Sequence, residues 1–255
     1  MEPHLLPSWY VISLRPRGSH QPLRRGAARL GAGFVALSPW SLQALDDPPA
    51  RRALEQALAS DVIVFTSPPA VRAAAALQPL RADGQQWLAV GSATAAALRR
   101  AGINAVLAPQ RMDSEGLLAL PVLHDLHGRS VGLVTAPDGR SLLAAGLIQR
   151  GAQLRRADVY RRCELPLSAP ALRQLDDARG AGMLMVSSAK ALQQVLSQLD
   201  HDRRERLLQA TAVVASERLR QLAVEQGFAA VATAAGPRPA QLLSTAVHVM
   251  GARIR

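Results

Sequence analysis

The stretch DVIVFTSPPAVRAAAAL at residues 61–77 decides the fold, because it joins a short apolar run directly to a segment with helical spacing. The run VIVF is short and unbroken, which is typical of strands buried on both faces of a parallel sheet. Apolar residues in the alanine-rich segment that follows recur at the spacing of a helix. The stretch therefore predicts a strand, a turn at Thr66 and Ser67, and a helix.

The same pattern returns at residues 182–198, GMLMVSSAKALQQVLSQ, where Ser188 takes the place of Ser67. We name this pair of stretches repeat B. Two other pairs match in the same way: repeat A is 10–42 with 130–162, and repeat C is 88–106 with 212–231. The order A-B-C-A-B-C indicates an internal duplication. Its alternating strands and helices predict an α/β fold of two doubly wound parallel sheets, with about five strands each.

The two junctions from repeat A to repeat B indicate where the domains divide, because both are rich in proline and polar residues. Their prolines are Pro39, Pro48, Pro49, Pro166 and Pro170. The junction from repeat C to repeat A is an ordinary short loop. We therefore expect linkers at 39–46 and 158–167, one domain at 47–157, and a discontinuous domain of 1–38 plus 168–255. A simple division near residue 127 is the alternative.

The chain is strongly basic, with 30 Lys and Arg against 19 Asp and Glu and a net charge of +11. Such a chain attracts polyanions, and the planar fork of arginine suits carboxylates. Only 3% of the residues are aromatic, so few rings could stack on bases, and we expect no nucleic-acid partner. No charge-free apolar run approaches the ~20 residues of a membrane helix, so we expect no membrane partner and a cytoplasmic protein. We also expect a monomer.

Motifs for cofactors and metals are absent from the sequence. The single cysteine, Cys163, excludes an internal disulfide framework and a cysteine-based metal cluster. His124 and His127 lack an acidic or cysteine partner, so metal binding is not expected. There is no phosphate-binding G-x-x-x-x-G-K-[ST] loop, no G-x-G-x-x-G after a strand and no G-x-S-x-G elbow. This pattern favours chemistry without a cofactor, in which the enzyme mainly positions an anionic substrate.

Polar residues gather where the expected strands end and the helices begin. They are Thr66, Ser67, Ser92, Thr94, Ser187, Ser188 and Ser216. Helix capping explains any one of them, because a hydroxyl there satisfies a free N–H group. As a set they also predict ligand binding, because open α/β sheets bind ligands beyond the carboxyl ends of their strands.

Three arginines and one tyrosine share this region. Arg15, Arg140 and Arg218 occupy turns between a strand and a helix, where they either pair with carboxylates or lie in solvent. Tyr160 follows the last strand of the second repeat A, at the expected linker. Its phenol either packs at a hinge or donates a proton to a leaving hydroxyl.

Over residues 9–250 these features resemble the uroporphyrinogen-III synthase family. The matching pieces are Arg15-Pro16 with Gly18, Val64-Phe65-Thr66-Ser67-Pro68, Val90-Gly91-Ser92-Ala93-Thr94, Ser114-Glu115-Gly116-Leu117-Leu118, Gly139-Arg140, Val159-Tyr160-Arg161-Arg162 and Ala215-Ser216-Glu217-Arg218. Their order and spacing together make the resemblance specific.

The resemblance implies two flavodoxin-like domains joined by a two-stranded linker, and a cofactor-independent lyase of heme biosynthesis. The implied substrate is hydroxymethylbilane, which has eight carboxylates, and the implied product is uroporphyrinogen III with ring D inverted. A transient contact with the upstream enzyme that forms the bilane is also expected. Tyr160 matches the tyrosine proposed in the family to assist departure of the hydroxyl.

The turns and the resemblance together give the candidate substrate-binding residues. They are Arg15, Thr66, Ser67, Ser92, Ala93, Thr94, Gly139, Arg140, Ser187, Ser188, Ser216 and Arg218. Two departures from the family pattern stand out: Pro69 replaces a polar residue and removes a backbone N–H, and Thr135-Ala136-Pro137 replaces an Arg-Gly pair. The alternative function is that of a non-catalytic, two-lobed regulatory protein that binds an anionic ligand.

Overall fold

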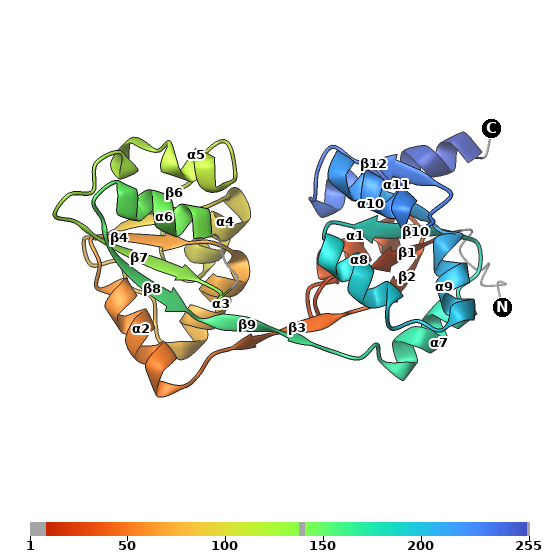
Figure 1. The fold of residues 1–255 in the computed structure, drawn as a ribbon, viewed down its shortest axis with the longest axis horizontal. Helices are drawn as coiled ribbons and strands as arrows, with labels where there is room; N and C mark the ends of the chain where they lie inside the picture. Colours follow the sequence, from red (N-terminus) through yellow and green to blue (C-terminus); the bar gives the residue numbers. More distant parts are fainter. Residues whose placement is uncertain (1–8, 138–140, 254–255) are drawn as a thin grey trace. The chain divides into compact units, whose positions relative to one another are not determined.

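The structure is a computed structural model that describes residues 9–137 and 141–253. Its chain divides into two compact units, each with its own sheet and core (Figure 1). Unit 1 consists of Met1–Ser41 with Cys163–Arg255, and unit 2 of Leu42–Arg162. Unit 2 is therefore continuous in sequence and interrupts unit 1.

Unit 1 contains a five-stranded sheet in the order β12-β11-β10-β1-β2, in which neighbouring strands run parallel. The strands are β1 (Trp9–Ser13), β2 (Gly33–Ala36), β10 (Ala181–Val186), β11 (Thr211–Val214) and β12 (Val231–Thr233). The helices are α1 (Gln21–Arg29), α7 (Ala169–Asp177), α8 (Ala189–Leu196), α9 (His201–Leu208), α10 (Glu217–Glu225) and α11 (Pro239–Arg253). If the five strands are numbered in chain order and read from the β2 edge, their order in the sheet is 2-1-3-4-5, which is the flavodoxin-like arrangement.

Unit 2 contains a second five-stranded parallel sheet, in the order β6-β5-β4-β7-β8. The strands are β4 (Val62–Phe65), β5 (Gln86–Ala89), β6 (Val106–Leu107), β7 (Ser130–Thr135) and β8 (Gln153–Asp158). The helices are α2 (Pro48–Leu58), α3 (Pro68–Leu77), α4 (Ser92–Arg100), α5 (Ser114–Leu118) and α6 (Ser141–Gln149), with a short 3-10 helix η1 (Pro121–Leu123).

The two sheets have the same spatial order once the repeats are matched. Repeat A supplies β1 and β2 in unit 1 and β7 and β8 in unit 2, at one side of each sheet. Repeat B supplies the central strand, β10 or β4, and repeat C supplies the other side. Unit 2 is thus a circular permutation of unit 1, and the prediction of two doubly wound parallel sheets is confirmed.

Alternating burial explains why an unbroken apolar run forms strand β4. Ile63 and Phe65 pack into one hydrophobic cluster of unit 2, whereas Val62 and Val64 pack into another. Successive side chains of a strand point to opposite faces, so both faces of the sheet are covered. On one of them, the ring of Phe65 stacks on Trp87 with a centroid separation of 5.8 Å.

A separate two-stranded sheet is formed by β3 (Trp40–Ala44) and β9 (Tyr160–Glu164), the segments in which the chain enters and leaves unit 2. The amide of Leu45 donates to the carbonyl of Val159, and the amide of Leu165 donates to that of Pro39, both at 2.9 Å. Between these two pairs the residue number rises from 39 to 45 on one segment and falls from 165 to 159 on the other, so the two strands run antiparallel.

Candidate functional site

The candidate site of unit 2 lies where the neighbouring strands β4 and β7 end. The chain leaves β4 toward β5 on one side of the sheet and leaves β7 toward β8 on the other, so the strand order reverses here. Such switch points are where open α/β sheets bind ligands. Thr66 directly follows β4 and Thr135 is the last residue of β7. Both are buried, and the Thr66 hydroxyl donates to that of Thr135 at 2.9 Å.

Ser67, the next residue, joins two parts of unit 2 that are far apart in sequence. It is the N-cap of α3, and its Oγ accepts a hydrogen bond from the amide of Ala70 at 3.3 Å. The same Oγ lies 3.1 Å from the phenolic oxygen of Tyr160, the first residue of β9. The Tyr160 ring is buried in the cluster that includes Phe65 and Val159. A proton donor and a second hydroxyl therefore meet at the carboxyl end of β4.

The start of α4 lies at the carboxyl end of the next strand, β5. Gly91 is the N-cap, so the capping explanation is wrong for Ser92, which begins the helix instead. The amide and the hydroxyl of Ser92 both point at the sulfur of Met112, at 3.4 and 3.2 Å. Ser92 and Ala93 are exposed, whereas Thr94 is buried. Gly139 and Arg140 lie outside the described residues.

In unit 1 the corresponding switch point lies between β1 and β10, and Arg15 follows β1. One guanidinium nitrogen, Nη2, donates to the carbonyl of Pro237 at 3.3 Å. The Nε atom is buried and has no hydrogen-bond partner within the described part of the chain. Burial lowers the pKa of Arg15 from its ordinary value. A partly desolvated guanidinium is suited to pairing with a carboxylate.

The other predicted residues of unit 1 follow β10 and β11. Ser188 is half-buried and caps α8, since its Oγ accepts from the amide of Ala191 at 3.3 Å; Ser187 beside it is exposed. Ser216 is the N-cap of α10 but makes no side-chain capping bond, and Arg218 in the first turn is exposed. Capping is therefore confirmed for Ser188 and Ser67 and wrong for the side chain of Ser216.

Sequence reasoning missed His20, a buried residue near the end of β1. Its ring nitrogens lie 2.9 Å from Oγ of Ser13 and 2.7 Å from Oγ of Ser38. Sequence reasoning also missed the role of Thr135, which stands out in the sequence only because the family pattern has an arginine there. In the structure Thr135 is the hydrogen-bond partner of Thr66. The duplication offered a signal for Thr135, because repeat A places it beside the central strand in the sheet.

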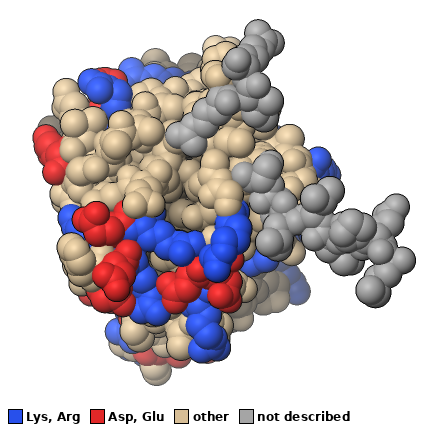
Figure 2. Space-filling model, turned by 90° about the vertical axis from the view of Figure 1, so that its right-hand side faces the viewer, with Lys and Arg blue, Asp and Glu red and all other residues tan. Residues whose placement is uncertain are grey.

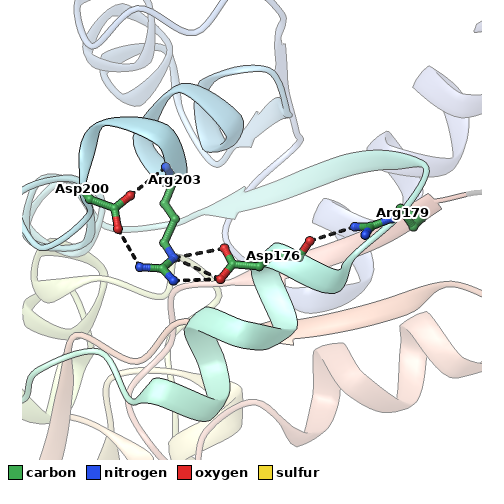
Figure 3. A network of polar contacts seen from close by, with 4 residues as sticks. All are labelled: Asp176, Arg179, Asp200 and Arg203. Atoms are coloured by element: carbon green, nitrogen blue, oxygen red, sulfur yellow. Dashed lines mark hydrogen bonds and ion pairs between the residues drawn. The ribbon is translucent and has the colours of Figure 1, made fainter.

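A charged network lies at the other end of the unit 1 sheet, where α7 and α9 lead into β10 and β11 (Figure 3). The guanidinium of Arg203 binds both carboxylate oxygens of Asp176, with Nη2 to Oδ2 at 2.8 Å, and its Nη1 donates to Asp200 at 2.6 Å. The bond from Arg203 holds the pKa of Asp176 below its ordinary value. On the face drawn in Figure 2, acidic and basic side chains are intermixed, so the net positive charge forms no single-sign patch there.

Within residues 9–137 and 141–253, no group of three or more His, Cys, Asp or Glu side chains could hold a metal ion. Among those same residues, no helix has the length and apolar character needed to span a bilayer.

Comparisons with known proteins agree with one another. The family model described as uroporphyrinogen-III synthase HemD matches residues 22–244. The uroporphyrinogen-III synthase of Escherichia coli is 35% identical over 144 residues, which are 56% of this chain and 58% of that protein. That of Salmonella typhimurium is 33% identical over 157 residues, 58% and 64% of the two chains. The matched region therefore spans less than two thirds of either curated relative.

A solved structure extends the comparison to the fold. It is a crystal structure of a mutant uroporphyrinogen III synthase from the extremely thermophilic bacterium Thermus thermophilus, which superposes with a TM-score of 0.59 at 19% sequence identity. The superposition covers 95% of this chain and 98% of that one. The likeness supports the same α/β architecture over nearly the whole chain.

Proposed function

Because this chain belongs to the uroporphyrinogen-III synthase family, we propose that it cyclises hydroxymethylbilane to uroporphyrinogen III, with inversion of ring D and loss of water. The match of the family model to residues 22–244 carries the proposal. The two switch points support it, because one presents a phenol beside a serine hydroxyl and the other a partly buried arginine. The alternative of a non-catalytic regulator draws no support from relatives that are named as synthases.

In the proposed reaction, Tyr160 gives its proton to the terminal hydroxyl of the bilane, and the C–O bond breaks with its electron pair going to oxygen. Water leaves and an electrophilic azafulvenium cation remains, with the phenolate of Tyr160 as the counter-charge. Attack by the substituted carbon of ring D gives a spiro intermediate, which fragments and recombines with ring D turned over. The final closure releases one proton from the substrate, which restores the phenol, so the overall change is loss of water.

Substrate binding is assigned to residues at the carboxyl ends of the strands. Arg15 pairs with a carboxylate through its guanidinium group, of which Nη2 also donates to the carbonyl of Pro237. The helix starts at Ser92-Ala93, Ser187-Ser188 and Ser216 present backbone N–H groups and partial positive charge to other carboxylates. Thr66 and Thr94 are buried, so in this proposal they shape the turns. Gly139, Arg140 and Arg218 remain candidates for the same role.

The wider proposal concerns how the molecule works as a whole. The two units act as two domains with linkers at 39–46 and 158–167, and the protein is a cofactor-independent, cytoplasmic monomer that contacts the upstream bilane-forming enzyme transiently. Spontaneous closure of the bilane proceeds without inversion. Catalysis then consists largely of holding a folded conformer and directing the attack to one carbon, which is a positioning effect.

The test supplies hydroxymethylbilane to the purified chain and separates the type I and type III products by chromatography. We expect type III product with the protein and type I product in its absence. Tyr160→Phe is expected to lower turnover while leaving the thermal unfolding curve unchanged. Type I product alone from the folded wild-type protein would refute the proposed function.

A further inference from the structure

Three polar groups of unit 2 form a chain of contacts that ends at Tyr160. The amide of Ala70 donates to Oγ of Ser67 at 3.3 Å, and this Oγ lies 3.1 Å from the Tyr160 phenol. Ser67 and Tyr160 are 93 positions apart, so the fold brings them together. Burial of the Tyr160 ring fixes the phenol at this position.

Either hydroxyl can be the donor in the contact between Ser67 and Tyr160, and the two arrangements differ in which proton they leave free. A serine hydroxyl has one proton and can accept two hydrogen bonds. Oγ of Ser67 already accepts from Ala70, so its own proton is available for the phenolic oxygen. If Ser67 donates, the phenol keeps its proton for another acceptor. In the reverse arrangement that proton is occupied by Ser67.

The two prolines at the start of α3 favour donation by Ser67. Pro68 and Pro69 occupy the first helical positions and have no N–H group. Ala70 is therefore the first amide of the helix that can donate, and it donates to Ser67. The partial positive charge of a helix N-terminus is concentrated on such amides. This charge polarises the Ser67 hydroxyl toward donation. Pro69, a departure from the family pattern, contributes by removing one N–H group, so that the first available amide of the helix is that of Ala70, which donates to Ser67.

We infer that Ser67 is a positioning residue for Tyr160. It donates to the phenolic oxygen, which leaves the phenol proton free for the departing hydroxyl of the substrate. The same bond stabilises the negative charge that develops on the phenolic oxygen as the proton leaves, because the donor is already in place. This inference rests on the proposed function and gives Ser67 a role beyond contact with the substrate.

The kinetic test uses Ser67→Ala, Ser67→Thr and a matched control. Asp47 caps α2 in the same unit by accepting from the amide of Ala50 at 2.8 Å, so Asp47→Ala removes a cap without touching Tyr160. We expect Ser67→Ala to lower kcat about 100-fold with KM nearly unchanged. Ser67→Thr should keep most of the activity, and Asp47→Ala all of it. Equal losses in Ser67→Ala and Asp47→Ala would overturn the inference.

A second arm asks whether Ser67 acts through Tyr160. In a Tyr160→Phe background, Ser67→Ala should lower kcat by less than about twofold, since residues that act as a unit are not additive. Multiplicative losses would contradict the inference. They are distinguishable from failure of the proposed function, in which the wild-type protein itself yields no type III product.

A spectroscopic arm needs no activity. The chain has two tyrosines, so protein labelled with 13C at the tyrosine ζ carbon gives two signals, which Tyr160→Phe assigns. We expect Ser67→Ala to shift the Tyr160 signal and leave that of Tyr10 in place, and Ser67→Thr to restore it. An unmoved Tyr160 signal in Ser67→Ala would show that the hydrogen bond is not formed in solution.

Discussion

Nδ1 of His20 lies 2.9 Å from Oγ of Ser13, and both residues are buried. The other ring nitrogen reaches Ser38 at 2.7 Å, so the imidazole connects the end of β1 to the segment that follows β2. Burial, then the charges of Arg24 and Arg15, lowers the pKa of His20 from 6.5 to about 4. The folded protein therefore holds this histidine neutral.

The first prediction concerns stability against pH. Between pH 6.5 and 4 the unfolded chain binds a proton at His20 that the folded chain does not. The free energy of unfolding therefore falls as the pH is lowered from 6.5 toward 4, and the contribution of neutral His20 is fully present above pH 6.5. His20→Gln should flatten this slope in urea unfolding between pH 7 and 4.5. His248→Gln, at an exposed histidine of α11, is the control. Equal slopes in His20→Gln and wild type would contradict the prediction.

The second prediction concerns the close approach of β7 to α2. A Cβ atom on Gly132 would lie 1.9 Å from the carbonyl oxygen of Ala57. Gly132→Ala must therefore push the helix off the sheet, at a cost of about 3 kcal/mol, and thermal unfolding should show a clear drop in Tm. Gly251→Ala in α11 meets nothing within 4 Å and should leave Tm nearly unchanged. A drop of similar size in both variants would argue against the contact.

The third prediction concerns the ion pair that connects α7 to α9 (Figure 3). Asp176→Asn and Arg203→Gln should each lower Tm, and the double variant should lose less than the sum, because one shared interaction is removed. The pKa of Asp176 is lower in the folded state than in the unfolded chain. The ionised carboxylate therefore adds to the free energy of unfolding above the ordinary aspartate pKa, and this stabilisation is lost as the pH falls below that value. Asp177→Asn, the exposed neighbour, is the control. Strict additivity in the double-mutant cycle would refute the coupling.

The fourth prediction concerns the partly buried guanidinium of Arg15. In the bilane assay, Arg15→Gln should raise KM about tenfold or more, with a smaller effect on kcat. Arg15→Lys should recover only part of the loss, since lysine lacks the planar fork. Arg17→Gln, at an exposed residue two positions on, should behave as wild type. An unchanged KM in Arg15→Gln would remove Arg15 from the binding residues.

Local pattern was enough to predict much of the fold. Short apolar runs and the duplication of repeats A, B and C predicted two parallel sheets, because a strand buried on both faces needs an unbroken apolar sequence. Matching Ser67 with Ser188 also predicted the two helix starts that these residues cap. Capping depends on neighbours three residues away, so the sequence contains the whole signal.

The contacts of the candidate site could not be predicted in the same way. Ser67 meets Tyr160, and His20 meets Ser38, only after strands far apart in sequence have paired. No spacing rule connects a serine at a helix start to a tyrosine 93 positions later. The contact between Ser92, the first residue of α4, and the sulfur of Met112 likewise depends on the path of a loop, which no periodicity in the sequence predicts.

The pairing of β1 with β10 has a consequence for synthesis on the ribosome. The partner strand begins at Ala181, so after β2 is made the ribosome must add the whole of unit 2 before that edge of β1 can be covered. At ordinary translation rates this takes on the order of ten seconds, while residues 42–162 already have every strand of their own sheet. The nascent chain thus leaves this edge of β1 uncovered while unit 2 is made, and chaperone demand is expected to fall on this first strand rather than on the inserted unit.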